Sequence, residues 1–130
     1  MKKFLCLLAA LNLAPVYAQD FNFAYLEFIN LLEDGAFEQL KANISDNTMV
    51  GFGPNEEGYD AFLRVFSEND PCHKQLVTTL KLGCALTDDK TGCIAPPSAA
   101  NDQVIGISTT AKFTFSNGKL LANYLICAGD

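Results

Sequence analysis

Few side chains in this sequence could carry catalytic chemistry, and the first of them is the single histidine. His73 lies between Cys72 and Lys74. Any mechanism that uses an imidazole as acid, as base or in a Ser-His-Asp triad must therefore use His73. No Gly-x-Ser-x-Gly motif, the turn that exposes a nucleophilic serine, accompanies it. We interpret His73 as an exposed residue at the junction of a helix and a strand rather than as a catalytic base.

The cysteines predict cross-links rather than a metal site. Once the N-terminal segment described below is removed, four cysteines remain: Cys72, Cys84, Cys93 and Cys127. An even number in a small exported domain predicts two disulfide bonds. A zinc site is the rival interpretation, but the sequence has no Cys-x-x-Cys pair and one histidine. We therefore expect no metal and no cofactor.

Two pairs of neighbouring carboxylates are the remaining candidates. Asp88-Asp89 could bind a cation, but the pair falls in a predicted hairpin turn, where aspartate is common because it bonds to nearby backbone. No EF-hand spacing accompanies it. Glu56-Glu57 suits the positive start of the helix that follows. Neither pair predicts a metal site.

The first 18 residues have the pattern of a secretory signal peptide. A basic start precedes an almost entirely apolar run from Phe4 to Ala14, and Val16-Tyr17-Ala18 fits a signal-peptidase site, so we predict cleavage after Ala18. The apolar run is shorter than the ~20 residues of a membrane-spanning helix. We therefore expect a mature domain of residues 19–130 that is secreted or periplasmic and not bound to a membrane.

The charge of the mature domain argues against one class of partner. The sequence has 9 basic and 15 acidic residues, and two of the basic ones belong to the signal peptide, which leaves a net charge of −8 at pH 7. Nucleic-acid binding requires a basic surface, so we expect no nucleic-acid partner. A mature chain of this length forms one domain with one core.

The strongest structural pattern is a β-hairpin near the C-terminus. From Ile105 to Ser116, apolar and polar residues alternate, as in a strand with one buried face. Asn117-Gly118 then matches a type I′ turn, which needs positive φ at both positions. A two-residue loop pairs Ala111 with Tyr124, and it places Phe113 and Tyr124 on the same apolar face.

Helices precede the strands in the predicted order. Apolar spacing predicts one helix from Phe21 to Gly35 and another that ends at Asn69-Asp70-Pro71. Strands are predicted over Thr48–Phe52 and over Gln75–Ala85, where apolar residues alternate. Helices gathered before a hairpin-rich sheet predict the α+β class, with the helices packed on one face of a curved, mostly antiparallel sheet.

This strand model favours one of the three connectivities that four cysteines allow. A two-residue turn at Asp88-Asp89 places Cys84 opposite Cys93. The predicted strand that starts at Gln75 and the last strand share an edge of an up-and-down sheet, which brings Cys72 near Cys127. We favour Cys84–Cys93 and Cys72–Cys127 as a hypothesis, although the sequence alone leaves the other pairings open.

Four segments of the chain carry a loose pattern that covers nearly all of the mature domain. They are Leu31–Phe37 after the first helix, Asp46–Phe52, Gly58–Leu63 at the start of a helix, and Phe113–Leu120 before the last strand. In this pattern the chain resembles the nuclear transport factor 2-like superfamily, which includes the polyketide cyclase-like and ketosteroid isomerase-like groups. It departs from that pattern in its four cysteines and in Pro96-Pro97.

The resemblance implies a cone-shaped pocket between the first helix and the concave face of the sheet. Six residues that our strand parity turns inward are candidates to line it: Tyr25, Phe28, Leu80, Thr109, Phe113 and Tyr124. Enzymes of the superfamily place a carboxylate or histidine base in this pocket, and the predicted inward rows contain neither. Family members often dimerise through the outer face of the sheet, so a homodimer is a further expectation.

Three functional hypotheses follow. The first is non-catalytic binding of a small apolar molecule or a protein partner. The second is a ketosteroid isomerase-like or dehydratase-like enzyme, which requires a buried carboxylate facing Tyr25 or Tyr124. The third is a cystatin-like protease inhibitor, but the chain has no tryptophan for that family's Pro-Trp hairpin, and Gln103-Val104-Ile105-Gly106 departs from its Gln-x-Val-x-Gly loop.

Overall fold

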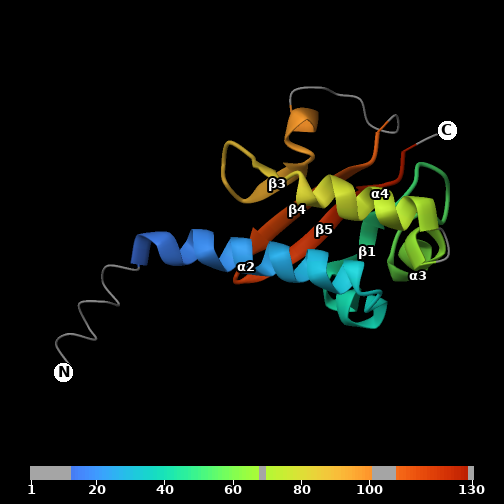
Figure 1. The fold of residues 1–130 in the computed structure, drawn as a ribbon, viewed down its shortest axis with the longest axis horizontal. Coiled ribbons are helices and arrows are strands. Elements are labelled where there is room, and N and C mark those ends of the chain that lie inside the picture. The colour runs from blue at the N-terminus through green and yellow to red at the C-terminus, as the bar shows by residue number, and fades with distance from the viewer. Residues whose placement is uncertain (1–12, 68–69, 101–107, 129–130) are drawn as a thin grey trace.

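The chain folds as helices packed against one face of a five-stranded sheet, which is the α+β class expected from the sequence (Figure 1). The computed structural model describes residues 13–67, 70–100 and 108–128. Most of the predicted signal peptide and the segment Gln103–Gly106 lie outside the described residues.

The helical elements come mainly from the first two thirds of the chain. They comprise three α-helices, two 3-10 helices and one π-helical turn among the described residues: α2 (Leu13–Glu33), η1 (Phe37–Asn43), α3 (Tyr59–Phe62), η2 (Leu63–Ser67, the π turn), α4 (Asp70–Lys81) and η3 (Pro97–Ala100).

The strands form one open sheet in the order β1-β5-β4-β3-β2. Their bounds are β1 (Ile44–Met49), β2 (Ala85–Leu86), β3 (Gly92–Ala95), β4 (Thr110–Ser116) and β5 (Lys119–Ile126). β1 pairs with β5 in parallel, and the other three pairs are antiparallel. β1 therefore begins four residues before the predicted strand Thr48–Phe52. Thr48, predicted as the first residue of the strand, lies near the end of β1, where its Oγ1 donates a hydrogen bond to the Ala122 carbonyl at 2.6 Å.

Helix α2 ends at Glu33, and the backbone conformation of Gly35 caps this end. Gly35 has a φ of +74°, in the left-handed region that glycine tolerates best. Its N–H bonds to the Leu32 carbonyl at 3.1 Å, and the Ala36 N–H bonds to the Leu31 carbonyl at 2.9 Å. These two bonds form a Schellman motif, which satisfies carbonyls that the helix leaves without partners.

The structure confirms the predicted hairpin turn and the predicted residue pairs next to it. Asn117 and Gly118 have φ values of 53° and 75°, as a type I′ turn requires. Ser116 pairs with Lys119, and Phe113 pairs with Ala122. Phe113 is buried, whereas its neighbour Thr114 is exposed, so the predicted alternation of faces holds along β4.

The hairpin register changes between Lys112 and Phe113, which makes one of our expectations wrong. Asn123 is an extra residue in β5, and beyond this bulge Tyr124 pairs with Lys112 instead of Ala111. Because side chains alternate along a strand, one extra residue moves all later side chains to the opposite face. Tyr124 therefore lies on the outer face of the sheet and Leu125 on the inner face.

The predicted strand Gln75–Ala85 is also wrong, because Asp70–Lys81 forms helix α4. Leu76 and Leu80 are buried, but Thr78 and Leu82 between and beyond them are exposed. A spacing of four residues fits both an alternating strand and one face of a helix, so this short stretch was ambiguous. Pro71 lies in the first turn of α4, a position that tolerates proline, instead of ending the preceding helix.

The core is an aromatic layer between α2 and the sheet. The ring centroid of Phe113 lies 5.2 Å from that of Phe28 and 5.8 Å from that of Tyr25, both with edge-to-face geometry. Phe21 contacts Phe115 edge to face at 5.6 Å. Edge-to-face pairs of this kind contribute about 0.5–1.5 kcal/mol beyond the area that they bury. Phe113, which contacts two rings of α2, is therefore central to the fold.

We predict that Phe113→Asp prevents folding, because it places an unpaired carboxylate among aromatic rings. Circular dichroism should show no cooperative thermal transition. The matched control is Thr114→Asp, the exposed neighbour on the same strand, which should melt cooperatively. A folded Phe113→Asp variant would contradict the assigned face of β4.

Candidate functional site

The structure brings four of the six predicted pocket residues together, but as packed core. Tyr25, Phe28, Leu80 and Phe113 have exposed fractions between 0% and 7%. The Tyr25 hydroxyl donates a hydrogen bond to the Leu80 carbonyl at 2.6 Å, and both Tyr25 and Phe28 contact the ring of Phe113. These side chains fill the space between α2 and the sheet.

The remaining two predicted residues lie apart from this group. Thr109 is buried just before β4, where its hydroxyl donates to Gln75 Oε1 at 2.7 Å. Tyr124 lies on the outer face of the sheet, with the Lys112 ammonium 4.8 Å from its ring centroid. This cation–π contact accounts for the half-buried state of Tyr124 on a face that no described helix covers.

The hydroxyl of Tyr25 is held in its protonated form. Burial raises the pKa of Tyr25 above its usual value, because desolvation disfavours the phenolate. Its one proton is already donated to the Leu80 carbonyl. The buried polar side chains of the described residues are all threonines: Thr48, Thr79, Thr109 and Thr110. Tyr25 therefore faces no carboxylate within the described core.

His73 has a structural contact that its sequence position did not reveal. It lies in α4, half-buried, rather than exposed at a helix–strand junction. Its Nε2 lies 2.5 Å from the Leu32 carbonyl, near the end of α2, and its ring centroid lies 5.6 Å from that of Phe37. His73 thus joins α4 to the C-terminus of α2, at a carbonyl that also accepts the Gly35 N–H.

Asp88 and Asp89 lie in a tight turn. The Asp89 carboxylate accepts bonds from the Thr87 hydroxyl at 2.6 Å, the Thr91 hydroxyl at 2.8 Å and the Thr91 N–H at 3.1 Å. These donors, first of all the Thr87 hydroxyl, lower the pKa of Asp89 to about 2. Among the described residues, no group of three His, Cys, Asp or Glu side chains could hold a metal ion.

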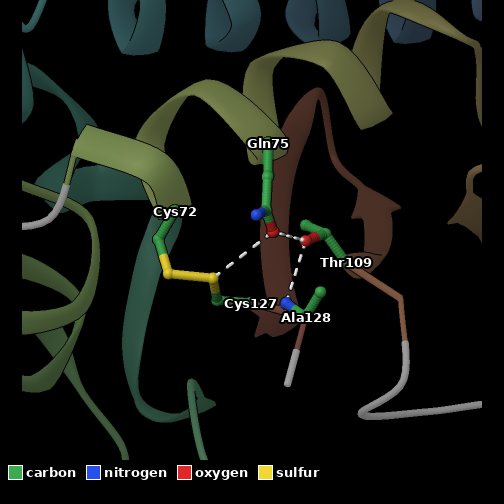
Figure 2. The surroundings of a disulfide bond; sticks show 5 residues. All are labelled: Cys72, Gln75, Thr109, Cys127 and Ala128. Atoms are coloured by element: carbon green, nitrogen blue, oxygen red, sulfur yellow. Dashed lines mark hydrogen bonds between the residues drawn. A yellow bond between two sulfur atoms is a disulfide. The ribbon is translucent and has the colours of Figure 1, made fainter. Parts of the chain in front are cut away.

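The disulfides have the connectivity that the sequence favoured, but for partly different reasons. Cys84 bonds to Cys93, although Cys93 pairs directly with Leu86 in the β2–β3 ladder. Cys72 bonds to Cys127, and this bond joins helix α4 to the end of β5 rather than two strand edges (Figure 2). Disulfides are typical of proteins from oxidising compartments.

Figure 2 shows a polar network beside the Cys72–Cys127 bond. Thr109 Oγ1 donates to Gln75 Oε1, and it accepts the Ala128 N–H at 2.9 Å. Cys127 Sγ lies 3.6 Å from Gln75 Oε1; because a disulfide sulfur carries no proton, this is a contact rather than a hydrogen bond. The network fixes the start of β4 and the end of β5 to α4.

A groove opens next to this network, and we call it the α4–β4 groove. It has a volume of about 500 Å³ and includes Lys74, Gln75 and Thr78 of α4, then Leu82, Pro96 and Thr109. The sequence pattern did not reveal this groove, because the alternating apolar residues in this part of the chain predict a strand, whereas the structure has helix α4 there. The exposed residues that recur every four positions, Lys74, Thr78 and Leu82, were the available signal for a helix wall.

Removal of the disulfides should destabilise the protein unequally. Cross-linking restricts the unfolded chain more when the closed loop is longer, and the two separations are 55 and 9 residues. The chain-entropy relation gives about 4 kcal/mol for Cys72–Cys127 and about 2.6 kcal/mol for Cys84–Cys93. Urea unfolding of the two double Cys→Ser variants measures both losses, and a larger loss for Cys84–Cys93 would contradict this order.

The Asp89 turn should respond to acid. A carboxyl with a lowered pKa stabilises the fold above its unfolded pKa, near 3.8, and this stabilisation is lost as the pH falls through about 2. NMR titration should place the Asp89 carboxyl near 2 and return it toward its usual value in Thr87→Val. An Asp89 pKa that stays the same in Thr87→Val would contradict the role of the Thr87 hydroxyl.

The remaining observations concern the chain as a whole. None of the helices in the described ranges is both long enough and apolar enough to cross a membrane. Comparisons with protein-family models, with curated proteins and with solved structures found no match to this chain.

Proposed function

We propose that the chain is an exported, disulfide-stabilised binding domain of the nuclear transport factor 2-like superfamily that acts without catalysis. Its partner is a second copy of the same chain, bound through the outer face of the sheet. The observation that carries this proposal is a row of half-buried side chains that crosses all five strands of that face.

The N-terminal sequence pattern and the two disulfides both support export. The basic and apolar start of the sequence fits a signal peptide. Two disulfides are typical of an exported domain of this size. Membership of the superfamily is supported by the order of elements, with α2 first, β1 and α4 next, and a hairpin-rich sheet last.

The row follows directly from the strand register. From β2 to β1, each residue of the row pairs with a residue on the next strand, so all of them share one face of the sheet. The row consists of Ala85, Ile94, Lys112, Tyr124 and Met49. All five are half-buried. Figure 1 shows α2 and α4 on the opposite side of the sheet, and no helix among the described residues packs on the row.

The composition of this face suits a contact between two copies. The row contains no carboxylate, and its one charge, Lys112, already lies over the ring of Tyr124. Interface centres are depleted of charged residues and enriched in tyrosine and methionine. A two-fold axis would bring the same face of each copy together, as in most homodimers.

The size of the face predicts a weak dimer. The strand lengths and the usual spacings give a projected area of roughly 400 Å². A stable interface buries about 800 Å² on each partner. The dimer should therefore exchange with monomer, and its fraction should rise with protein concentration.

The absence of a base in the described core supports binding rather than catalysis. The enzyme alternative needs a carboxylate or histidine near Tyr25 or Tyr124. Tyr25 is surrounded by aromatic and aliphatic side chains, and Tyr124 faces the Lys112 ammonium. Neither phenol is placed opposite a group that could remove a proton from a substrate.

Analytical ultracentrifugation over a range of concentrations tests the proposal. The wild-type protein should sediment increasingly as a dimer, and Ile94→Glu should remain a monomer because it places a carboxylate within the face. The control is Phe23→Glu, a side chain that is 69% exposed on helix α2 and outside the row. A wild-type protein that stays monomeric, or a dimer that only Phe23→Glu dissociates, would overturn the proposal.

A further inference from the structure

The α4–β4 groove combines one cationic end with one apolar end. Lys74, Thr78 and Leu82 follow each other at intervals of four residues, so they form one wall along the helix. The Leu82 N–H bonds to the Thr78 carbonyl at 3.3 Å, which continues this wall beyond the last residue of α4. From Lys74 to Leu82 the wall extends about 12 Å, given the helical rise.

We propose that this groove binds a free amphipathic carboxylate, of the class of medium-chain fatty acids. The carboxylate lies at Lys74, and the alkyl chain runs along Thr78 to Leu82 and Pro96. The 12 Å wall matches the extended length of such a molecule. The groove volume of about 500 Å³ is also in the range of small-molecule sites.

The polar end supplies donors that the fold leaves open. Gln75 Oε1 accepts the Thr109 hydroxyl, so the orientation of the amide is fixed and its NH₂ group is turned away from Thr109. Within the described part of the chain, neither the Lys74 ammonium nor the Thr78 hydroxyl has a hydrogen-bond partner. An ammonium and a hydroxyl are suitable donors for a carboxylate, and Lys74 and Thr78 supply them here.

The apolar end of the groove exposes side chains that a bound alkyl chain would cover. The side chain of Leu82 is 65% exposed, and Pro96 faces it across the groove. Burial of a leucine side chain contributes about 1.5–3 kcal/mol when it is complete. A bound alkyl chain would cover Leu82 and Pro96 together.

Charge distinguishes this groove from three others in the described structure. Lys74 is its one charged residue. The others contain Asp88 and Asp89, or Asp46, Glu57 and Asp60, or Glu27. A mainly apolar groove with a lone cation favours an anionic ligand over a cationic one.

The groove is held in its open form before a ligand arrives. The Cys72–Cys127 bond joins α4 to the end of β5, and the hydrogen bonds of Thr109 join α4 to the start of β4. A preformed site avoids part of the ordering cost of binding. The groove lies at an end of the sheet, and none of its residues belongs to the row proposed as the dimer face, so either proposal can fail without the other.

Titration of the isotope-labelled mature protein with decanoate tests the inference. Amide shifts should move at Lys74, Gln75, Thr78 and Leu82, and calorimetry should give a dissociation constant for a single site. Decyltrimethylammonium, which has the same chain and the opposite charge, should bind more weakly, by up to about fivefold for the usual value of an exposed charge pair. Acetate, which lacks the chain, should produce no shifts.

Paired variants locate the two ends of the ligand. Lys74→Gln should weaken decanoate binding up to about fivefold, and Leu82→Ala should weaken it about tenfold through lost apolar contact. The controls are Lys41→Gln, a cation in another groove, and Leu86→Ala, a leucine that is 55% exposed elsewhere. Both should bind as the wild type does.

Several results would overturn the inference. These are an absence of shifts below the micellar concentration of decanoate, shifts confined to another part of the chain, and equal affinity for decyltrimethylammonium. Binding to anionic lipid vesicles without binding to monomeric decanoate would assign the groove to a membrane surface instead. Thermal melts of each variant, with transitions close to that of the wild type, establish that weakened binding does not come from unfolding.

Discussion

The contact of Phe113 with Tyr25 and Phe28 is the interaction on which the rest of the structure depends. These three rings join the middle of the sheet to the first long helix, and together they occupy the volume between the two layers. Aromatic side chains bury large areas, so a few of them can fill a small core. The same packing decides where function can reside. With the interior occupied, the two proposed binding sites are the outer face of the sheet and the groove beside α4.

Helix α4 connects these features. Its inner face supplies Leu76 and Leu80 to the core, and its outer face supplies Lys74 and Thr78 to the groove. Its first turn is joined covalently to the end of β5 through Cys72. An element held by packing on one side and by a disulfide at one end has little freedom to tilt. The position of the groove is therefore determined by the same residues that stabilise the fold.

The sequence predicted those parts of the fold in which a local pattern and a turn agree. Asn117-Gly118 and the alternation around Phe113 each indicated the same hairpin, and the hairpin is present. The face of Tyr124 was unpredictable because the bulge at Asn123 depends on the pairing of β5 with both β4 and β1. The helix α4 was missed because Leu76 and Leu80 satisfy two periodicities at once. The predicted pocket residues were largely placed near each other, but whether they leave a cavity depends on three-dimensional packing that spacing does not encode.

The parallel pairing of β1 with β5 has a consequence for the order of folding. The strand that comes last in the chain lies between β1 and β4, so contacts between residues near 44 and residues near 122 are needed to complete the sheet. Contacts over such separations form slowly, because a long loop must close first. A chain that emerges N-terminus first lacks this strand until the residues of β5 have been synthesised. Until then the edge of β1 that pairs with β5 has no partner strand.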